Sequence, residues 1–174
     1  LGVAGGSITG KNRVGGLVGY NTGSISNVYA TASVTGVYGV GGLVGYNDGG
    51  SISNAYATGS ASGTKDYTGG LVGKNTGSIN YAYATGTVTG TTTDTGGLVG
   101  YNSGSISNAY ATGSVSGVSN VGGLVGNNAD GGTYSNDFWN STTTGQAYGA
   151  GESITPTGVT GLMAGWTLGG YPTA

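Results

Sequence analysis

Acidic side chains are the first residues of this sequence that could do chemistry, because its 174 residues include neither His nor Cys. An enzyme of this composition would have to take its acid, base or nucleophile from carboxylates, Lys, Tyr or Ser. Asp66 and Asp94 form the candidate pair, in variable stretches of neighbouring repeats, where two carboxylates could act on a glycosidic bond. We favour the alternative that both are solvated loop charges beside Lys65, so the sequence predicts no catalytic residues and no enzyme.

Two further acids raise the question of a bound cation. Asp48 and Asp130 each precede a Gly-Gly pair in an expanded turn, where a carboxylate could ligate a loosely held ion. The nonapeptide repeat that binds calcium carries an Asp in every turn, and this sequence lacks that pattern. We therefore expect neither a metal site nor a cofactor.

Composition also limits the partners. Four Lys or Arg stand against six Asp or Glu, so no basic stripe is available for a phosphate backbone and nucleic acid is not expected as a partner. No apolar run approaches the ~20 residues that span a bilayer, so membrane insertion is not expected. The 42 Gly follow no collagen period, and 13 Tyr with regularly spaced Leu, Val and Ile argue against disorder.

The dominant feature of the sequence is an internal repeat. A Gly-Leu-Val-Gly motif recurs at residues 16–19, 42–45, 70–73, 97–100 and 123–126, and the motif leucines lie 26, 28, 27 and 26 residues apart. A period near 27 predicts an all-β, parallel β-solenoid (β-helix) whose coils each contain three short strands. Helical repeats are excluded because each interior Gly would cost about 1 kcal/mol.

Stacked coils lie about 4.8 Å apart, so each repeated residue forms a column along the axis. The expected inward columns are Leu17, Leu43, Leu71, Leu98 and Leu124; Ile25, Ile52, Ile79 and Ile106; and Val34, Ala61, Val88 and Val115. The valines after the motif leucines (Val18, Val44, Val72, Val99 and Val125) are expected to face solvent, unless a bulge buries both residues or a partner covers them. The asparagines Asn21, Asn47, Asn75, Asn102 and Asn128 recur at the next turn, where their amides can stack on the neighbouring coil.

The first candidate binding surface is a row of tyrosines that alternation sends outward, here called the Tyr ladder. It consists of Tyr29, Tyr56, Tyr83 and Tyr110. Exposed aromatic rows can stack on sugar rings or pack against another protein. The alternative is that stacked tyrosines serve only to stabilise the solenoid.

The second candidate binding surface is a lattice of outward hydroxyl side chains, here called the Thr/Ser face. It consists of Thr31, Ser33, Thr35, Thr58, Ser60, Ser62, Thr85, Thr87, Thr89, Thr112, Ser114, Ser116, Thr142 and Thr144. Such a flat, uncharged array resembles the ice-binding faces of β-solenoid antifreeze proteins. The plain alternative is that any soluble solenoid needs Thr and Ser at outward positions.

Composition changes near the end of the chain. Both Trp, both Pro, the single Phe and the single Met lie after residue 133. We therefore expect residues 1–133 to form the solenoid repeats and residues 134–174 to form the last coil and a C-terminal cap. The first coil is partial, which suggests that the chain continues upstream.

The motif and the segment that follows it, Asn-x-Gly-Ser-Ile-Ser-Asn-Ala-Tyr-Ala-Thr-Gly-Ser-Val-Ser-Gly, resemble the GLUG-motif repeats of bacterial surface proteins. Residues 137–146 resemble the aromatic segment that closes such arrays in filamentous-haemagglutinin-like adhesins. The resemblance implies a secreted or cell-surface bacterial protein that acts without catalysis, as a rigid stalk or as a binding surface for a host or matrix glycan or protein. The alternative is an ice-binding (antifreeze) protein whose partner is the ice surface, and self-association remains a further option.

Overall fold

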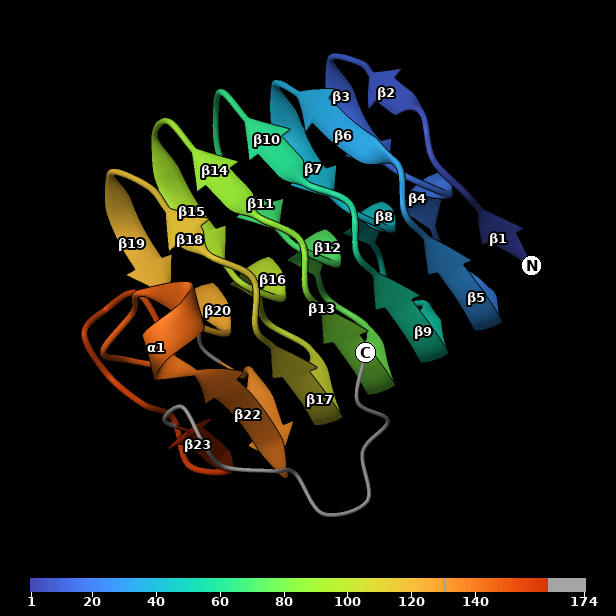
Figure 1. The fold of residues 1–174 in the computed structure, drawn as a ribbon. Coiled ribbons are helices and arrows are strands. Elements are labelled where there is room, and N and C mark those ends of the chain that lie inside the picture. Colours follow the sequence, from blue (N-terminus) through green and yellow to red (C-terminus); the bar gives the residue numbers. More distant parts are fainter. Residues whose placement is uncertain (130, 163–174) are drawn as a thin grey trace.

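The computed structural model describes residues 1–129 and 131–162, which form a parallel β-solenoid (Figure 1). Strands of neighbouring coils pair in register about one repeat apart, as Ser78 does with Ser51 and Ser105. About five coils are stacked in this way, and within the described residues helix is confined to α1 (Ser141–Thr144). The predicted parallel β-solenoid with a 27-residue period is confirmed.

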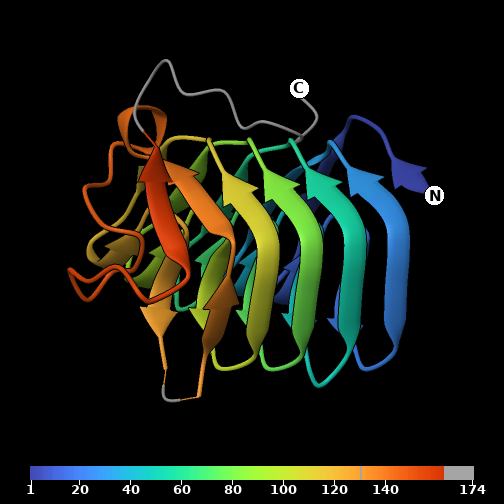
Figure 2. The ribbon, with the colours of Figure 1, turned by 90° about the horizontal axis from the view of Figure 1, so that it is seen from below.

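Each complete coil contributes one strand to each of four parallel sheets, here called sheets A to D. Sheet A contains β1 (Gly2–Val3), β5 (Ser24–Ala30), β9 (Ser51–Ala57), β13 (Ser78–Ala84), β17 (Ser105–Ala111), β22 (Asp137–Asn140) and β23 (Val159–Leu162), and β21 (Thr133–Ser135) also pairs with β17. Figure 2 shows the strands of this sheet side by side along the molecule. Sheet B contains β2 (Ser7–Thr9), β6 (Ser33–Gly36), β10 (Ala61–Gly63), β14 (Val88–Gly90) and β18 (Val115–Ser116).

The other two sheets follow sheet B in each coil. Sheet C contains β3 (Asn12–Gly15), β7 (Tyr38–Gly41), β11 (Thr68–Gly69), β15 (Thr93–Gly96) and β19 (Ser119–Gly122). Sheet D contains β4 (Val18–Asn21), β8 (Val44–Asn47), β12 (Val72–Asn75), β16 (Val99–Asn102) and β20 (Val125–Asn128). The expectation of three strands per coil is therefore wrong, because the variable stretch that the repeat pattern assigns to a turn forms the strands of sheet C.

A bend between sheets C and D decides where the motif side chains point. The backbone N–H groups of Leu43 and Val44 both donate to the carbonyl oxygen of Leu71, at 2.9 and 3.0 Å, so the chain turns a corner between these two residues. Both side chains consequently face the interior, and both are fully buried. The expectation that the motif valines face solvent is therefore wrong. The structure instead has the alternative, a local irregularity of the strand that buries both the leucine and the valine.

Within residues 1–129 and 131–162, the interior consists of two apolar clusters. The larger contains the motif leucines and valines, the isoleucines of sheet A and the alanines that follow them, while the smaller lies between sheets B and C around Val34 and Val40. The inward columns that the sequence predicts are confirmed from Leu43 and Ile52 onward, and Leu17 and Ile25 of the first coil are partly exposed.

The inward column of sheet C carries two threonines where other coils carry valine. Val40 pairs with Thr68, and Thr68 pairs with Thr95. Both threonines are fully buried, and neither hydroxyl has a hydrogen-bond partner among the described residues. A buried hydroxyl without a partner costs free energy that a methyl group of the same size does not.

Replacing Thr68 by Val is therefore expected to raise the free energy of unfolding by about 1 kcal/mol, measured by urea denaturation. Thr93→Val is the matched control on the same sheet, because the Thr93 hydroxyl donates a 3.0 Å hydrogen bond to Asp66. The control is expected to be neutral or destabilising. A Thr68→Val variant that is less stable than the wild type would show that the buried hydroxyl has a partner.

Asp137 makes the stability of the fold depend on pH. Its carboxylate is fully buried at the start of β22 and accepts hydrogen bonds from the backbone N–H groups of Ala109 (2.9 Å) and Ser135 (3.1 Å). Burial raises the pKa of this carboxyl group from its ordinary 3.8 to about 7, although the two backbone hydrogen bonds lower it. Between these values the folded state binds a proton that the unfolded state releases, so this contribution to stability is lost as the pH rises from about 4 through about 7.

The urea midpoint is therefore expected to be higher at pH 5 than at pH 8. Asp48, whose pKa is lowered mainly by a hydrogen bond from Tyr20, contributes stability that is lost only below its ordinary 3.8, outside this window. Asp137→Asn is expected to flatten the profile between pH 5 and pH 8. An equally steep profile in that variant would assign the pH dependence to another group.

Residues beyond the last repeat lie against the end of the coil stack. The backbone N–H groups of Leu124 and Val125 both donate to the carbonyl oxygen of Gly149, and β23 adds a strand to sheet A beside β22. The division at residue 133 stays a prediction, and residues 163–174 of the expected cap, with Met163 and Trp166, lie outside the described residues. Within the described chain, no helix combines the length and apolar character needed to cross a bilayer.

Candidate functional site

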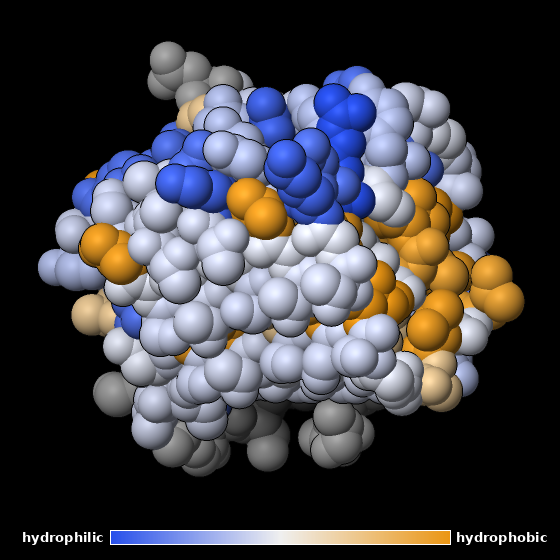
Figure 3. All heavy atoms as spheres, turned by 90° about the horizontal axis from the view of Figure 1, so that it is seen from above, coloured by the Kyte–Doolittle hydropathy of each residue, from blue (hydrophilic) through white to orange (hydrophobic). Residues whose placement is uncertain are grey.

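Sheet B carries most of the Thr/Ser face. The outward side chains flank the inward column of Val34, Ala61 and Val88 and form two columns in register from coil to coil. One column is Ser7, Ser33, Ser60, Thr87 and Ser114, and the other is Thr9, Thr35, Ser62, Thr89 and Ser116. Most of the surface seen in Figure 3 is pale, with hydropathy near neutral, and hydrophilic groups gather toward one edge.

Other predicted members of the Thr/Ser face lie elsewhere. Thr31, Thr58, Thr85 and Thr112 are half-buried at the corner between sheets A and B. Thr142 and Thr144 do not continue the face, because Asn140 caps α1 there by accepting hydrogen bonds from the N–H groups of Thr142 and Thr143. Thr144 is buried, and its hydroxyl donates to the carbonyl oxygen of Asn140 at 2.7 Å. The lattice is thus two columns wide and ends at Ser114 and Ser116.

The Tyr ladder is present as a continuous stack on sheet A. Successive rings of Tyr29, Tyr56, Tyr83 and Tyr110 lie 5.2, 4.8 and 4.9 Å apart between centroids and are parallel to within 7°. The sequence prediction relies on alternation, but alternation alone would place Tyr56 on the same side as the buried Ile52, four residues earlier. Asn54 between them adopts a left-handed backbone (φ 48°) and reverses the alternation. Because each ring covers the face of the next, the half-buried Tyr29, Tyr56 and Tyr83 present ring edges to solvent rather than faces on which a sugar could stack. Tyr110, expected to face outward with them, is buried.

The two candidate carboxylates have different donors, and the expectation that both are solvated loop charges is wrong for Asp94, which is buried. Asp66 accepts a hydrogen bond from Thr93, whereas Asp94 is buried and accepts hydrogen bonds from the side-chain amides of Asn120 (2.7 Å) and Asn127 (3.3 Å). Both therefore take part in contacts between coils. Of the two residues proposed as cation ligands, Asp48 accepts hydrogen bonds from Tyr20 and Thr76, and Asp130 lies outside the described residues.

A column of left-handed residues in sheet C creates a site that the repeat pattern does not predict. Equivalent positions of the five coils are Arg13, Gly39, Tyr67, Asp94 and Asn120, all with φ between 50° and 67°. Arg and Tyr rarely adopt this backbone, which costs about 1–2 kcal/mol per residue. In the second coil the column has no side chain, because Gly39 stands there.

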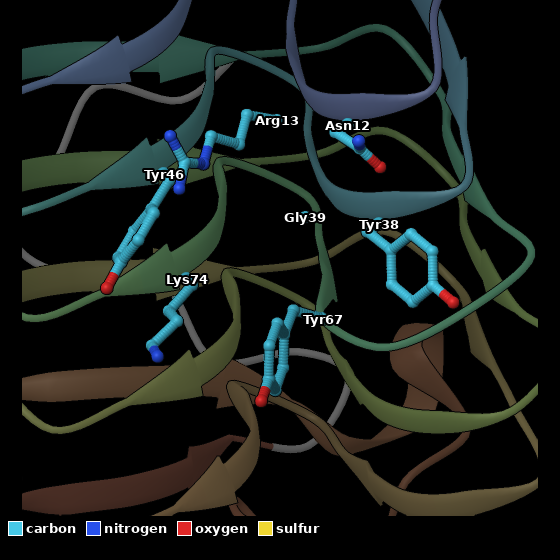
Figure 4. A pocket seen from close by; sticks show the side chains of 7 residues that line it. All are labelled: Asn12, Arg13, Tyr38, Gly39, Tyr46, Tyr67 and Lys74. Carbon is cyan, nitrogen blue, oxygen red and sulfur yellow. The ribbon is translucent and has the colours of Figure 1, made fainter.

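The gap at Gly39 is a pocket of about 400 Å³ between the outer surfaces of sheets C and D. It is lined by Asn12, Arg13, Tyr38, Gly39, Tyr46, Tyr67 and Lys74 (Figure 4). The two sheets can approach this closely because the motif residue Gly73 has no side chain, and an added Cβ there would lie 2.6 Å from the backbone of Gly39. A volume of this size is within the usual range of ligand pockets, about 300–1,000 Å³.

The cations of the pocket lie over tyrosine rings. The guanidinium carbon of Arg13 is 4.5 Å from the ring centroid of Tyr20, and the ammonium nitrogen of Lys74 is 5.1, 5.4 and 4.9 Å from the ring centroids of Tyr46, Tyr67 and Tyr101. Neither cation is paired with a carboxylate among the described residues. The one signal in the sequence is a departure from the repeat, since Lys74 replaces the tyrosine that other coils carry at this place, as Tyr46 and Tyr101 do.

Comparisons with known proteins agree with the repeat architecture. Residues 10–35, 36–62, 66–89 and 91–116, together more than half of the chain, match the model of the GLUG motif. Among solved structures, the chain is similar to a putative immunoglobulin A1 protease from Bacteroides ovatus, with a TM-score of 0.74 and 25% sequence identity over 93% of the chain. The chain spans 58% of the length of that protein. No curated protein sequence matches the chain significantly.

Proposed function

The chain belongs to the GLUG-motif family, and we propose that it is a non-catalytic binding segment of a larger secreted or cell-surface bacterial protein, as in an adhesin. Its counterpart in this proposal is a host or matrix glycan or a protein. The observation that carries the proposal is the pocket at Gly39, where aromatic rings and unpaired cations converge on the surface of an otherwise uniform coil stack. A small number of polar groups that point toward one another beside aromatic side chains is typical of small-ligand sites.

The rest of the coil stack supports a role as a rigid support. Side-chain amides stack through the interior, from Asn21 to Asn47 to Asn75 to Asn102, through hydrogen bonds of 2.7, 2.8 and 2.8 Å. Such fully bonded columns hold each coil in one register with the next. A larger protein could therefore use the segment to hold the binding surface at a fixed position.

Binding of the purified chain to a glycan array and to immobilised matrix glycoproteins tests this proposal. We expect saturable binding to at least one glycan or glycoprotein, with the ligand recovered unchanged. Because the similar Bacteroides ovatus protein is a putative immunoglobulin A1 protease, immunoglobulin A1 is incubated with the chain as a parallel sample. Cleavage of immunoglobulin A1, or no measurable binding in any of the binding assays, would contradict a non-catalytic binding segment.

Ice binding is the second candidate, and the regular two-column lattice on sheet B is the observation that favours it. If this face binds ice, the purified chain shows thermal hysteresis, and Thr87→Tyr abolishes it because Thr87 is exposed within one column, between Ser60 and Ser114. Thr85→Tyr is a poorer test, since Thr85 is half-buried at the corner of the coil. Freezing without hysteresis or crystal shaping would remove this candidate.

A further inference from the structure

The chemistry of the pocket at Gly39 identifies a class of ligand. Among the described residues, its lining combines two cations, Arg13 and Lys74, with the phenol rings of Tyr38, Tyr46 and Tyr67 and includes no acid. The hydrogen bond from Tyr20 lowers the pKa of Asp48 most, and this acid lies near enough outside the lining for both cations to lower its pKa as well. A phenol ring can pack against the C–H face of a sugar ring, and Tyr38 is the lining ring over which no described cation lies, whereas Lys74 lies over Tyr46 and Tyr67. Phenol hydroxyls can also bond the hydroxyl groups of a sugar. Guanidinium and ammonium groups can form charge-assisted hydrogen bonds with a carboxylate.

We propose that this pocket binds a carboxylate-bearing sugar unit of a glycan, such as a sialic or uronic acid. Two cations suit one carboxylate rather than a polyanion, in keeping with a net charge of −2 for the whole chain. This inference rests on the proposed binding function and gives it a place and a ligand class.

The backbone of the pocket sets the direction of two of its side chains. Arg13 and Tyr67, which flank Gly39 in the same column, both hold side chains on a left-handed backbone, with φ of 53° and 67°. The left-handed backbone recurs at this place in every coil, so it is a feature of the fold, and what it contributes to the pocket is the direction of these two side chains beside the gap at Gly39. Arg13 extends from this position across the pocket toward Tyr46 (Figure 4), with its guanidinium carbon 5.6 Å from the ring centroid.

Isothermal titration of the full chain with 3′-sialyllactose, and with lactose as the uncharged counterpart, tests the proposal. We expect sialyllactose to bind at least about tenfold more tightly than lactose, because only the acidic sugar meets the two cations. Raising the salt concentration is expected to weaken binding, since the pocket is open to solvent. A glucuronate-containing oligosaccharide serves as a second acidic probe.

Three variants locate the binding. Lys74→Gln is expected to weaken sialyllactose binding at least about tenfold, and Lys65→Gln, which removes an exposed charge outside the lining, less than about twofold. Gly39→Asn fills the gap with the residue that the fifth coil carries at this place, Asn120, on a backbone that Asn tolerates. An added Cβ at Gly39 meets its nearest atom at 3.6 Å, so the variant is expected to fold and to lose binding.

The outcomes separate this inference from the proposed function. Equal affinity for sialyllactose and lactose, wild-type affinity in Gly39→Asn, or no binding of either acidic probe would overturn the pocket as an acidic-sugar site. If another glycan or a glycoprotein still binds the chain in that case, the proposed function stands. If nothing binds, both fail.

Discussion

Replacing Gly70 by Ala is expected to lower the free energy of unfolding by about 3 kcal/mol or more, a large effect for the addition of a single methyl group. Gly70 belongs to the Gly-Leu-Val-Gly motif of the third coil, at the corner between sheets C and D. An added Cβ would lie against the backbone carbonyl oxygen of Gly97 in the next coil and 2.9 Å from the Cβ of Ala84. The carbonyl belongs to the stacked backbone, so it cannot move aside without separating two coils.

Gly23→Ala is the matched control for this substitution. Gly23 lies at a turn, has no other atom within 4 Å of an added Cβ, and does not adopt a left-handed backbone. The control is expected to change stability by less than about 0.5 kcal/mol. Urea denaturation followed by far-UV circular dichroism measures both variants, and equal stability of Gly70→Ala and the wild type would mean that the coils are packed less closely than the structure has them.

Replacing Asn75 by Asp is expected to cost about 3 kcal/mol at neutral pH. Asn75 is fully buried, accepts a hydrogen bond from the amide of Asn47, and donates to the side-chain oxygen of Asn102 (2.8 Å) and the carbonyl oxygen of Gly77 (3.3 Å). A carboxylate can still accept the first bond but can donate neither of the others. The substitution therefore buries a negative charge opposite two oxygen atoms.

The loss is expected to shrink as the pH falls, because a protonated carboxyl group can donate one of the missing hydrogen bonds. Asn54→Asp is the control, since Asn54 is exposed and Asp also tolerates its left-handed backbone. Thermal unfolding at pH 4.5 and pH 7.5 measures the difference. A loss that is independent of pH in Asn75→Asp, or equal in the two variants, would contradict the buried amide column.

The sequence predicts the features of this fold that repeat identically. The spacing of Leu43 and its equivalents predicts the coil, because a column of identical apolar residues can be buried only by parallel stacking. Asn47 and its equivalents predict the amide column for the same reason, and the structure confirms it from Asn21 to Asn102. The Tyr134 hydroxyl stands between Asn102 and Asn128 and links them. The period does not predict how each coil bends, since Leu43 and Val44 can both be buried only by a corner whose position depends on contacts with the next coil.

The candidate site depends on residues that do not recur from coil to coil, and the repeat period describes only the residues that do. Lys74 replaces the tyrosine of the neighbouring coils, and Gly39 belongs to a column in which every coil carries a different residue, so the repeat predicts neither side of the pocket. Nothing in the spacing shows that sheets C and D bring them together, because sheet C lies in a stretch that the repeat pattern leaves as a turn. The Tyr ladder illustrates the opposite case, in which a perfect repeat places Tyr29 and Tyr56 correctly but does not show that their faces are covered.

Mapping of a bound acidic sugar by two-dimensional NMR of the isotope-labelled chain tests the central claim most directly. Our account expects chemical shift changes at the backbone amides of Gly39, Tyr46 and Lys74, with the sugar unchanged at the end of the titration. Changes centred instead on Ser60 and Thr87 of the Thr/Ser face, or conversion of the sugar to products, would contradict a non-catalytic solenoid that binds its ligand between sheets C and D.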